Sequence, residues 1–396
     1  METLIFFLNL MQWILFVILT FSTLYLLYFS IAGIFSYHPR QRFDENFRKI
    51  AVLIPGYKED MVVVESASDA LQQNYPKDMF DVVVIADSLQ PNTLKALNNL
   101  PIKLIEVSFE KSTKSKALNK AMEQLPEDYA IAIILDADNL MERDFLKKIN
   151  MSFAAGYLAV QGHRVAKNMN TPFAILDAIS EEINNHIFRK GHRVSGLSSA
   201  IIGSGMAFEY SYFKNLMNGI KAVGGFDKEI ELKMLKEGKT IEYLPDAYVY
   251  DEKVQKSEVF SNQRRRWLSA QVHYFRIYIL DAIKEVFVHR NIDYFDKAFQ
   301  FIQPPRILLL GIITIIFIFS LIFNPLYIML FWLYLFGICV FTFLLSIPIK
   351  FYNIQTLKAI VYLPKGFFLM LISLLKIKGA NQRFIHTQHT SIKNNK

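Results

Sequence analysis

The sequence predicts an α/β domain with a mostly parallel sheet, flanked by helices that cross a membrane. Two observations predict it: short apolar runs alternate with helical patterns in the middle of the chain, and long uncharged stretches lie near its ends. The 396 residues include 52% apolar but only 20% charged residues, with a net charge of +8. This composition excludes a disordered or purely nucleic-acid-binding chain. The single cysteine, Cys339, excludes a disulfide framework and a Cys-based zinc site.

Three apolar segments have the length of membrane spans. Residues 4–35 form a stretch longer than the roughly 20 residues that cross a bilayer, and they contain no charged side chain. We expect residues 1–38 to form a retained transmembrane helix, because a secretory signal would need a basic start and a small-residue cleavage site. Asn324-Pro325 divides a second uncharged stretch into two membrane-length halves, which predicts a helical hairpin over residues 304–350.

Basic residues predict the orientation of these segments. Basic residues cluster at 40–49, after the first span, and Arg306 precedes the hairpin; loops rich in Lys and Arg remain in the cytoplasm. We therefore expect an integral membrane protein with residues 39–303 in the cytoplasm and the N-terminus outside. Residues 351–396, interrupted by Pro364, are predicted to form a re-entrant or interfacial segment and a basic cytoplasmic tail, with a fourth span as the alternative.

The middle region alternates between strand and helix patterns. Apolar runs typical of buried strands lie at residues 50–54, 81–86, 103–107, 130–135 and 158–161. Ligands of parallel sheets bind beyond the carboxyl ends of the strands, so polar residues just after these runs are the candidates for a site. The sequence contains no Gly-rich phosphate loop, and a P-loop or dinucleotide fingerprint is therefore not expected.

Asp136-Ala137-Asp138 follows the fourth of these runs. Two carboxylates at the mouth of a sheet would repel a phosphate unless a divalent cation lay between them, and hard oxygen ligands suit Mg²⁺ or Mn²⁺. The site would then bind a metal-diphosphate. The alternative is structural: Asn139 and Glu142 have the spacing of a capping box, and Asp138 could end a strand or cap a helix that begins there.

Two other strand ends carry similar candidates. Asp87 could accept hydrogen bonds from a ribose or a base edge, or be a turn residue. The loop from Pro55 to Glu59 could form, with Tyr57, one wall of a base pocket, or be a plain connection.

Later in the chain, two lysines, a glycine pair and an aspartate have candidate roles. Lys114 and Lys116 open a helical run and could meet phosphate or form a solvated basic face. Gly203-Ser204-Gly205 lets the backbone turn closely against a bulky group, either a sugar or another strand. Asp227 precedes a helical pattern, so it could be an N-cap or a general base for an attacking hydroxyl.

Gln263-Arg264-Arg265-Arg266-Trp267 is the most specific cluster. On a helix, Gln263, Arg266 and Trp267 share one face. Arg266 could bond a diphosphate, Trp267 could stack on a sugar ring and Gln263 could bond hydroxyls. The alternative is a basic patch on anionic lipid headgroups, a role that Arg264 and Arg265 could fill.

Seven motifs occur in an order that resembles the membrane branch of the family 2 glycosyltransferases, which includes the cellulose, chitin and hyaluronan synthases. They are P-G-Y-K-E-D, I-A-D-S, K-A-L-N, D-A-D, G-S-G, F-D-K-E-I-E-L and Q-R-R-R-W, and they cover residues from about 50 to 270. The resemblance implies a GT-A (Rossmann-like) catalytic domain that uses a nucleotide-activated sugar, usually a UDP-sugar, and inverts the anomeric centre in one step.

The resemblance and the strand-end residues together give a candidate site. Nucleotide-sugar binding is expected from Pro55, Tyr57, Glu59, Asp87, Lys116, Asp136, Asp138 and Arg266, with the metal at Asp138, and acceptor binding from Gly203, Ser204, Gly205, Gln263 and Trp267. Asp227 falls on the family's catalytic base. Phe226 stands where the family commonly has an acidic residue, which leaves Glu229 or Glu231 as alternative bases, and Lys58 stands where Asn is frequent.

Three classes of function remain open at this point. The first is a transferase at the cytoplasmic face that elongates a polysaccharide, decorates a lipid-linked acceptor or adds a single sugar to a glycolipid. The second is a catalytically decayed nucleotide-sugar-binding scaffold, which Phe226 motivates. The third is a transport component, whose three spans would need a homo-oligomer or an export partner. The acidic residues at each expected strand end argue against the last two.

Overall fold

The computed structural model describes residues 2–377, except Lys221, Val223 and Lys256. In this part of the chain, eight strands form one sheet in the order β3-β2-β1-β4-β7-β6-β8-β5. The strands are β1 (Ile50–Tyr57), β2 (Phe80–Asp87), β3 (Lys103–Val107), β4 (Ile131–Ile134), β5 (Leu140–Met141), β6 (Ala159–Ala166), β7 (Met206–Glu209) and β8 (Glu242–Asp251). All five predicted strands are present. The short strands β5 and β7, and β8, were not predicted.

Helices connect the strands, and further helices precede and follow the sheet domain in the sequence. They are α1 (Glu2–Ala32), α2 (Val63–Ala70), α3 (Pro91–Asn98), α4 (Lys114–Gln124), α5 (Phe145–Ala154), α6 (Pro172–Asn184), α7 (His192–Val194), α8 (Tyr210–Asn218), α9 (Phe226–Lys236), α10 (Ser257–His289), α11 (Ile292–Gln300), α12 (Arg306–Phe323), α13 (Leu326–Ser346), α14 (Ile354–Ile360) and α15 (Leu363–Leu375). A π-helical segment, η1 (Asn185–Gly191), joins α6 to α7, and a 3₁₀ turn, η2 (Ile349–Phe351), follows α13.

The sheet is mostly parallel because its first four strands run in one direction. β1 pairs with β2 and β4, and β2 pairs with β3, all in parallel register. β7 is antiparallel to both of its neighbours, β4 and β6, while β8 runs parallel to β6 on its other side. The carboxyl ends of β1, β2 and β4 therefore meet at one edge, where the candidate site lies.

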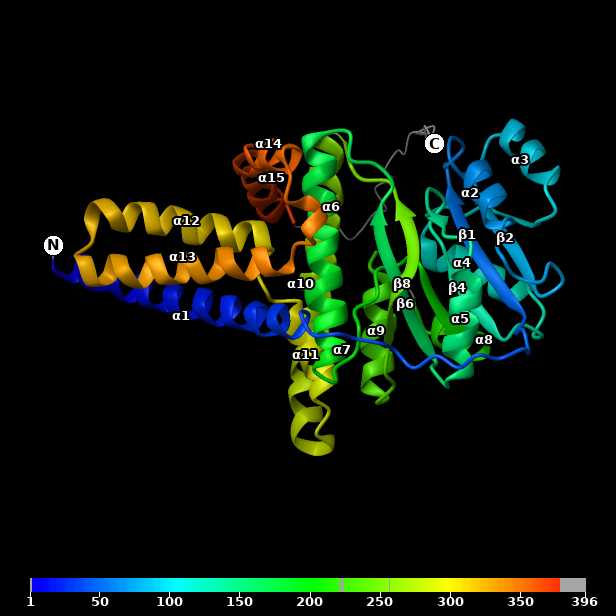
Figure 1. Cartoon of the computed structure of the whole chain (residues 1–396), viewed down its shortest axis with the longest axis horizontal. Coiled ribbons are helices and arrows are strands. Elements are labelled where there is room, and N and C mark those ends of the chain that lie inside the picture. Colours follow the sequence, from blue (N-terminus) through cyan, green and yellow to red (C-terminus); the bar gives the residue numbers. More distant parts are fainter. Residues whose placement is uncertain (1, 221, 223, 256, 378–396) are drawn as a thin grey trace.

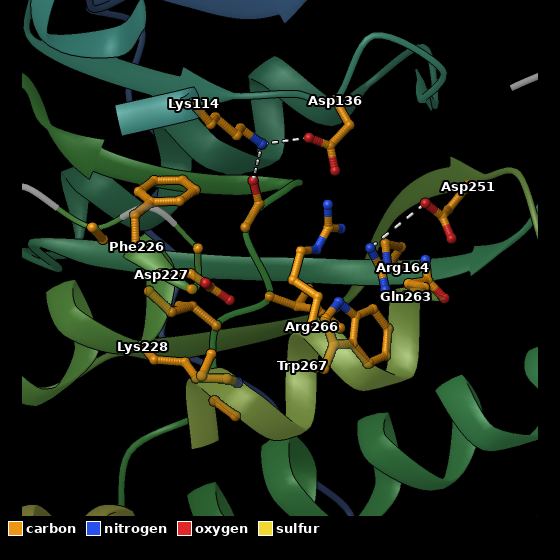
Figure 2. Close-up of a pocket in the computed structure, with 18 of the residues that line it drawn as sticks. Lys114, Asp136, Arg164, Phe226, Asp227, Lys228, Asp251, Gln263, Arg266 and Trp267 are labelled. Carbon is orange, nitrogen blue, oxygen red and sulfur yellow. Dashed lines mark hydrogen bonds and ion pairs between the residues drawn. The ribbon is translucent and has the colours of Figure 1, made fainter. Parts of the chain in front are cut away.

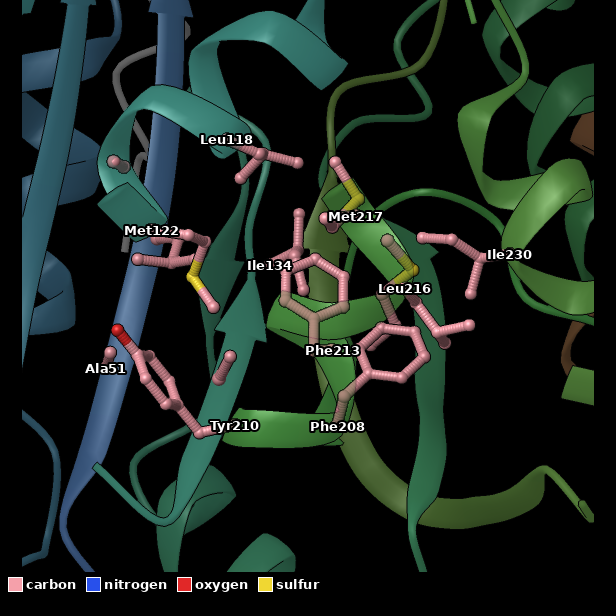
Figure 3. Close-up of a cluster of buried hydrophobic side chains, with 14 of the residues drawn as sticks. Ala51, Leu118, Met122, Ile134, Phe208, Tyr210, Phe213, Leu216, Met217 and Ile230 are labelled. Carbon is pink, nitrogen blue, oxygen red and sulfur yellow. The ribbon is translucent and has the colours of Figure 1, made fainter. Parts of the chain in front are cut away.

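Helices cover both faces of the sheet, as the continuous apolar runs predict. Ala51 and Leu53 of β1 pack on one side with α4, α8 and α9, a cluster that includes Phe208 and Phe213 (Figure 3). The alternate residues of β1 pack on the other side with α2, α3 and α5. Burying each large apolar side chain contributes about 1.5–3 kcal/mol, so this double layer fixes the strand ends that carry the site.

Three helices of the described residues are long and apolar enough to cross a membrane. They are Leu10–Ala32 within α1, then α12 and α13. Figure 1 shows them side by side, extending away from the sheet, with α6 and α10 running across their inner ends. α14 and α15 form a pair bent by 47°, which is the geometry of a broken span or a re-entrant loop. The predicted basic tail falls largely on residues 378–396, outside the described part.

Two glycines allow α1 to pack very closely on η1. A Cβ on Gly191 would lie 2.2 Å from the Phe29 carbonyl oxygen, and a Cβ on Gly33 would lie 2.6 Å from the His186 ring. The ring of Phe29 stacks on that of His192 with centroids 3.6 Å apart. The first apolar helix is thus attached directly to the segment that follows α6.

We expect Gly191→Ala to destabilise this junction by about 1–3 kcal/mol, because the added methyl group overlaps backbone of α1. Gly337→Ala in α13 is the matched control, since nothing lies within 4 Å of its Cβ position. That substitution should be neutral or stabilising, because Ala is the better helix former. The midpoint of thermal unfolding in detergent measures both, and equal midpoints for the two variants would contradict the close contact.

Candidate active site

A cavity of about 410 Å³ opens at the carboxyl ends of β1, β2 and β4 and extends to α6, α10 and α11. Most residues predicted for the site line it: Pro55, Tyr57, Glu59, Asp87, Asp136, Asp138, Gly203, Asp227, Gln263, Arg266 and Trp267. Lys116, Ser204 and Gly205 are not among the lining residues. The fold therefore brings together residues as far apart in the sequence as Pro55 and Trp267.

Lys114, rather than Lys116, reaches the cavity. The Lys114 ammonium pairs with the Asp136 carboxylate, donates to the Gly203 carbonyl oxygen at 2.7 Å and lies 5.4 Å from the centre of the Phe226 ring (Figure 2). Lys116 is exposed, and its ammonium donates to the Lys111 carbonyl oxygen at 2.8 Å. Residues two apart on a helix point in different directions, so only one of these lysines can face the cavity.

Ser204 and Gly205 support the wall from behind. The Ser204 hydroxyl accepts from the Asp136 backbone N–H at 2.9 Å and donates to the Asn139 side-chain oxygen at 2.6 Å, so it fixes the loop that carries the two aspartates. A Cβ on Gly205 would lie 3.0 Å from the Val249 side chain. Gly205 thus permits the close approach of another strand, β8, which was the alternative interpretation of this motif.

The predicted capping box after Asp138 is wrong. Leu140 and Met141 pair with β8 as strand β5, and the next helix begins only at Phe145. The Asn139 amide donates to Asp251 at 3.0 Å, and the Glu142 carboxylate accepts from Lys148 at 2.6 Å. Pairing with β8 satisfies the backbone hydrogen-bonding groups of Leu140 and Met141, which in a helix would have bonded along the helix axis.

The backbone is strained directly after strands β1 and β2. Lys58 and Ser88 adopt φ values of 56° and 59°, a left-handed conformation that costs a non-glycine residue about 1–2 kcal/mol. The Lys58 N–H donates to the Asp87 carbonyl oxygen at 3.1 Å, and the Ser88 hydroxyl donates to the Asp87 carboxylate at 3.0 Å. Among non-glycine residues Asn is one of those that tolerate this conformation best, which agrees with its frequency at the position of Lys58 in the family that the sequence resembles.

Asp227 lies in the first turn of α9 and does not cap it. The N-cap is Gly225, at φ 71°, so the N-cap interpretation of Asp227 is wrong. A Cβ on Gly203 would lie 3.8 Å from a carboxylate oxygen of Asp227, which places this carboxylate at the G-S-G wall of the cavity. It has no hydrogen bond or ion pair with any other described residue, so it is available to a ligand.

The two alternative bases are engaged elsewhere. Glu229 pairs with Lys233 at 2.9 Å and is not among the residues that line the cavity. Glu231 lines it but is only 2% exposed and pairs with Lys297 at 2.6 Å. Burial raises the pKa of Glu231 although Lys297 opposes the change. These contacts favour Asp227 over both glutamates.

The predicted face of α10 is directed into the cavity. Burial lowers the pKa of the Arg266 guanidinium, and the carboxylates of Asp136 and Asp227 partly offset this effect, so Arg266 lies within electrostatic reach of both. Figure 2 shows Arg266 projecting into the space between them. The guanidinium carbon of Arg264 lies 4.4 Å from the centre of the Trp267 ring.

Arg264 does not belong to an exposed basic patch. It is buried, and it pairs with Asp177 of α6, which lies opposite α10 across the cavity. The prediction for this residue is wrong, because helical spacing alone does not reveal that a second polar helix faces α10 at this point.

A buried ion cluster adjoins the cavity and was not predicted. The carboxylate of Glu181 pairs with Arg164 at 2.7 Å, Arg189 at 3.0 Å and Lys253 at 3.6 Å, and Lys253 also pairs with Asp251 at 2.7 Å. Burial alone would raise the pKa of Glu181, but these three cations outweigh it and hold the pKa well below its usual range. The only feature of the sequence that indicates this cluster is the occurrence of charged residues within otherwise apolar patterns.

The strand-end carboxylates fit a divalent cation that is shared with a ligand. In the described part of the chain, no group of three or more His, Cys, Asp or Glu side chains could hold a metal ion by itself. The ammonium of Lys114 on Asp136 marks a position that favours positive charge. Mg²⁺ commonly takes one or two protein carboxylates and completes its shell with substrate phosphates and water. Asp136 and Asp138 are sufficient for that arrangement.

Comparison with known proteins adds to this geometry. Residues 48–270 match the family model described as glycosyltransferase like family 2. The probable glycosyltransferase YdaM of Bacillus subtilis (strain 168) is 25% identical over 233 residues, 55% of this chain and 54% of that protein. The poly(ribitol-phosphate) beta-N-acetylglucosaminyltransferase TarS of Staphylococcus aureus (strain Mu50 / ATCC 700699) is 25% identical over 103 residues, 25% of this chain and 18% of that protein.

One solved structure has a similar fold over most of the chain. The mannosyltransferase PcManGT from Pyrobaculum calidifontis, in complex with GDP-Man and Mn²⁺, aligns with a TM-score of 0.51 at 18% identity, over 83% of this chain and 97% of that one. This likeness, with the sheet described above, confirms the predicted GT-A-like α/β fold. The chain spans about half the length of YdaM and a smaller share of TarS.

We expect Glu181→Gln to destabilise the protein by about 3–5 kcal/mol, because three buried cations lose their shared counter-charge while the side chain keeps its shape. The control is Glu123→Gln, which removes an exposed pair with Lys120 and should change stability by less than about 0.5 kcal/mol. Thermal unfolding in detergent compares the two. If Glu181→Gln unfolds at the wild-type temperature, the cluster does not stabilise the fold.

Proposed function

The chain belongs to the family 2 glycosyltransferases, and on that premise we propose that it moves a sugar from a UDP-sugar to a growing polysaccharide or lipid-linked acceptor at the membrane, with inversion. The observation that carries this proposal is the convergence of Asp136, Asp227 and Arg266, from three distant segments, on one cavity at the carboxyl edge of the sheet. We place the enzyme in the membrane branch that the sequence resembles, because apolar helices flank its catalytic domain.

The strand-end side of the cavity is suited to the donor. In our proposal the nucleotide lies against Pro55, Tyr57 and Asp87, and Glu59 closes the same wall. Arg266 and Lys114 face the diphosphate, whose negative charge compensates their burial. A Mg²⁺ or Mn²⁺ ion held by Asp138 and the diphosphate would neutralise charge on the departing nucleotide.

The opposite side is suited to the acceptor. Asp227 is the proposed base: its carboxylate takes the proton of the acceptor hydroxyl as the oxygen attacks the anomeric carbon and the bond to the nucleotide breaks. A single displacement of this kind inverts the anomeric centre. Gly203 keeps the space beside Asp227 open, and Gln263 and Trp267 would bond and stack on the acceptor sugar.

A decayed binding scaffold is the second candidate, and Phe226 is the residue that motivates it. The Phe226 ring contacts the Lys114 ammonium, so the change from an acidic residue gives Lys114 a cation–π partner, while Asp227 beside it remains open to a ligand. This arrangement favours an active enzyme. A glycolipid transferase that adds one sugar is the alternative within the enzyme class.

We further propose that the sheet domain lies in the cytoplasm, with the N-terminus outside. The basic residues that follow the first apolar helix support this orientation. A conduit of three spans would be narrow, so export of a polymer would require a homo-oligomer or a partner protein.

We expect purified full-length protein to turn over at least one UDP-sugar from a labelled panel in the presence of Mn²⁺ or Mg²⁺. Chromatographic sizing of the product separates single addition from polymer synthesis. Asp138→Asn should lose metal-dependent donor binding, because one carboxylate ligand is removed. Turnover of GDP-sugars alone would refute the UDP assignment, and binding without any turnover would support the scaffold.

We expect Asp227→Asn to bind the donor as the wild type does but to transfer sugar about 10²–10⁴ times more slowly, because an amide cannot accept the proton. Glu229→Gln is the matched control two residues further along α9, and it should retain transfer since Glu229 pairs with Lys233. Donor affinity and single-turnover rates measure the two effects separately. Loss of transfer in the Glu229 variant alone would mean that the base is misassigned.

A further inference from the structure

The cavity has a second part, which we call the α6–α10 lobe, between two polar helix faces. Asp177, Ser180 and Asn184 line it from α6, and Arg264, Trp267 and Gln271 line it from α10. Both sets have the i, i+3, i+7 spacing of one helix face. The lobe adjoins the acceptor side, because Trp267 lies in both.

Two arginines lie at this lobe, and only Arg264 forms an ion pair with a carboxylate there, among the described residues. Arg264 pairs with Asp177, but its Nε is buried without a hydrogen-bond partner among the described residues. Arg306 donates from Nη2 to the Ser180 carbonyl oxygen at 3.0 Å and to the Ser180 hydroxyl at 2.9 Å. Its Nη1 is buried and unpaired, and no carboxylate lies within 4.0 Å of it in the described part of the chain. The Glu181 carboxylate acts on Arg306 only from beyond ion-pair distance, and Arg264 and Arg189 repel it, so this buried charge is costly unless an anion binds nearby.

The groups that the lobe presents are mainly hydrogen-bond donors. Because the Ser180 hydroxyl oxygen accepts from Arg306, its own hydrogen is free to donate into the cavity. The Asn184 amide lines the cavity and has no hydrogen-bond partner among the described residues. The guanidinium of Arg264 lines it as well. A guanidinium, a hydroxyl and an amide together match the oxygens of a phosphate.

The position of the lobe indicates what carries that phosphate. Arg306 is the first residue of α12, one of the helices apolar enough to cross a membrane. Ser180, which bonds Arg306, therefore lies at the depth where the apolar span begins. A phosphate at this depth is positioned as in a lipid headgroup, with its hydrocarbon chain directed along the spans.

We propose that the α6–α10 lobe binds the phosphate of a phosphorylated lipid that serves as the acceptor, with Arg264, Ser180 and Asn184 as its ligands and Arg306 as the charge behind Ser180. This inference rests on the proposed function and names the substrate class: a lipid phosphate that carries sugar, whose attacking sugar hydroxyl lies toward Asp227. The phosphate groups of ordinary membrane phospholipids share the same chemistry, so the experiment separates the two sources.

The test measures binding of a radiolabelled polyprenyl phosphate to the full-length protein in phosphatidylcholine nanodiscs. Matched probes are the polyprenol without phosphate and phosphatidic acid at the same mole fraction. We expect the polyprenyl phosphate to bind at least about tenfold more tightly than either. Equal binding of the polyprenol would overturn the phosphate site, and equal binding of phosphatidic acid would overturn its assignment to an acceptor.

Variants locate the site. Asp177→Asn/Arg264→Gln removes the arginine without leaving a buried unpaired carboxylate, and Arg306→Gln removes the second charge; each should weaken polyprenyl phosphate binding about tenfold or more. Arg306→Lys should retain most of it. Arg276→Gln, an exposed arginine on α10, is the control and should bind as the wild type does. Equal affinity of Arg276→Gln and the two charge-removing variants would overturn the proposal.

UDP-sugar binding, measured on the same samples, distinguishes this inference from the proposed function. The lobe variants should keep wild-type donor affinity, which also shows that they are folded. Loss of donor binding in a variant would mean that the lobe acts on the donor, contrary to the proposal. If the wild type binds lipid phosphate but turns over no nucleotide sugar, the proposed function fails while the lipid-phosphate site remains.

Discussion

The buried carboxylate of Glu181 is the interaction on which the relation between the sheet domain and the membrane helices depends. It neutralises Arg164 of β6, Arg189 of η1 and Lys253, which follows β8, in a place with almost no access to solvent. Because each of these cations would be costly to bury alone, the carboxylate fixes α6 and η1 against the edge of the sheet. η1 in turn packs on α1 through Gly191, so one anion links catalytic domain and apolar helices.

The cavity lies where these two parts meet, and its charge distribution follows from that position. Carboxylates dominate at the strand ends, where Asp136 is already paired with Lys114. Guanidinium groups dominate toward α6 and α12, where Arg264 pairs with Asp177 and Arg306 bonds only Ser180 among the described residues. The gradient from acidic to basic suits a cation-bound donor at one end and an anionic acceptor at the other. Asp227 lies at the boundary between them.

Burial on both faces made the first strands predictable. β1 to β4 and β6 were found because a strand covered on both sides is a continuous apolar run, and such runs are visible without any knowledge of neighbours. β8 was missed because Pro245 interrupts it, and the ladder with β6 accommodates the proline through an irregular register. β5 was mistaken for a helix start because Asn139 and Glu142 have the spacing of a cap, while pairing with β8 is a contact between distant residues.

The sequence by itself determined the apolar helices, the parallel half of the sheet and a set of site residues most of which line the cavity, because apolar periodicity and polar residues at strand ends are local properties of the chain. Only the tertiary structure decided that Lys114 rather than Lys116 faces Asp136, that Arg264 is buried against α6, and that Glu181 gathers three cations. Those outcomes depend on the rotation and approach of elements far apart in the chain. The energies of these ion pairs depend on opposite charges being buried beside one another, a condition that exists only after the helices have packed.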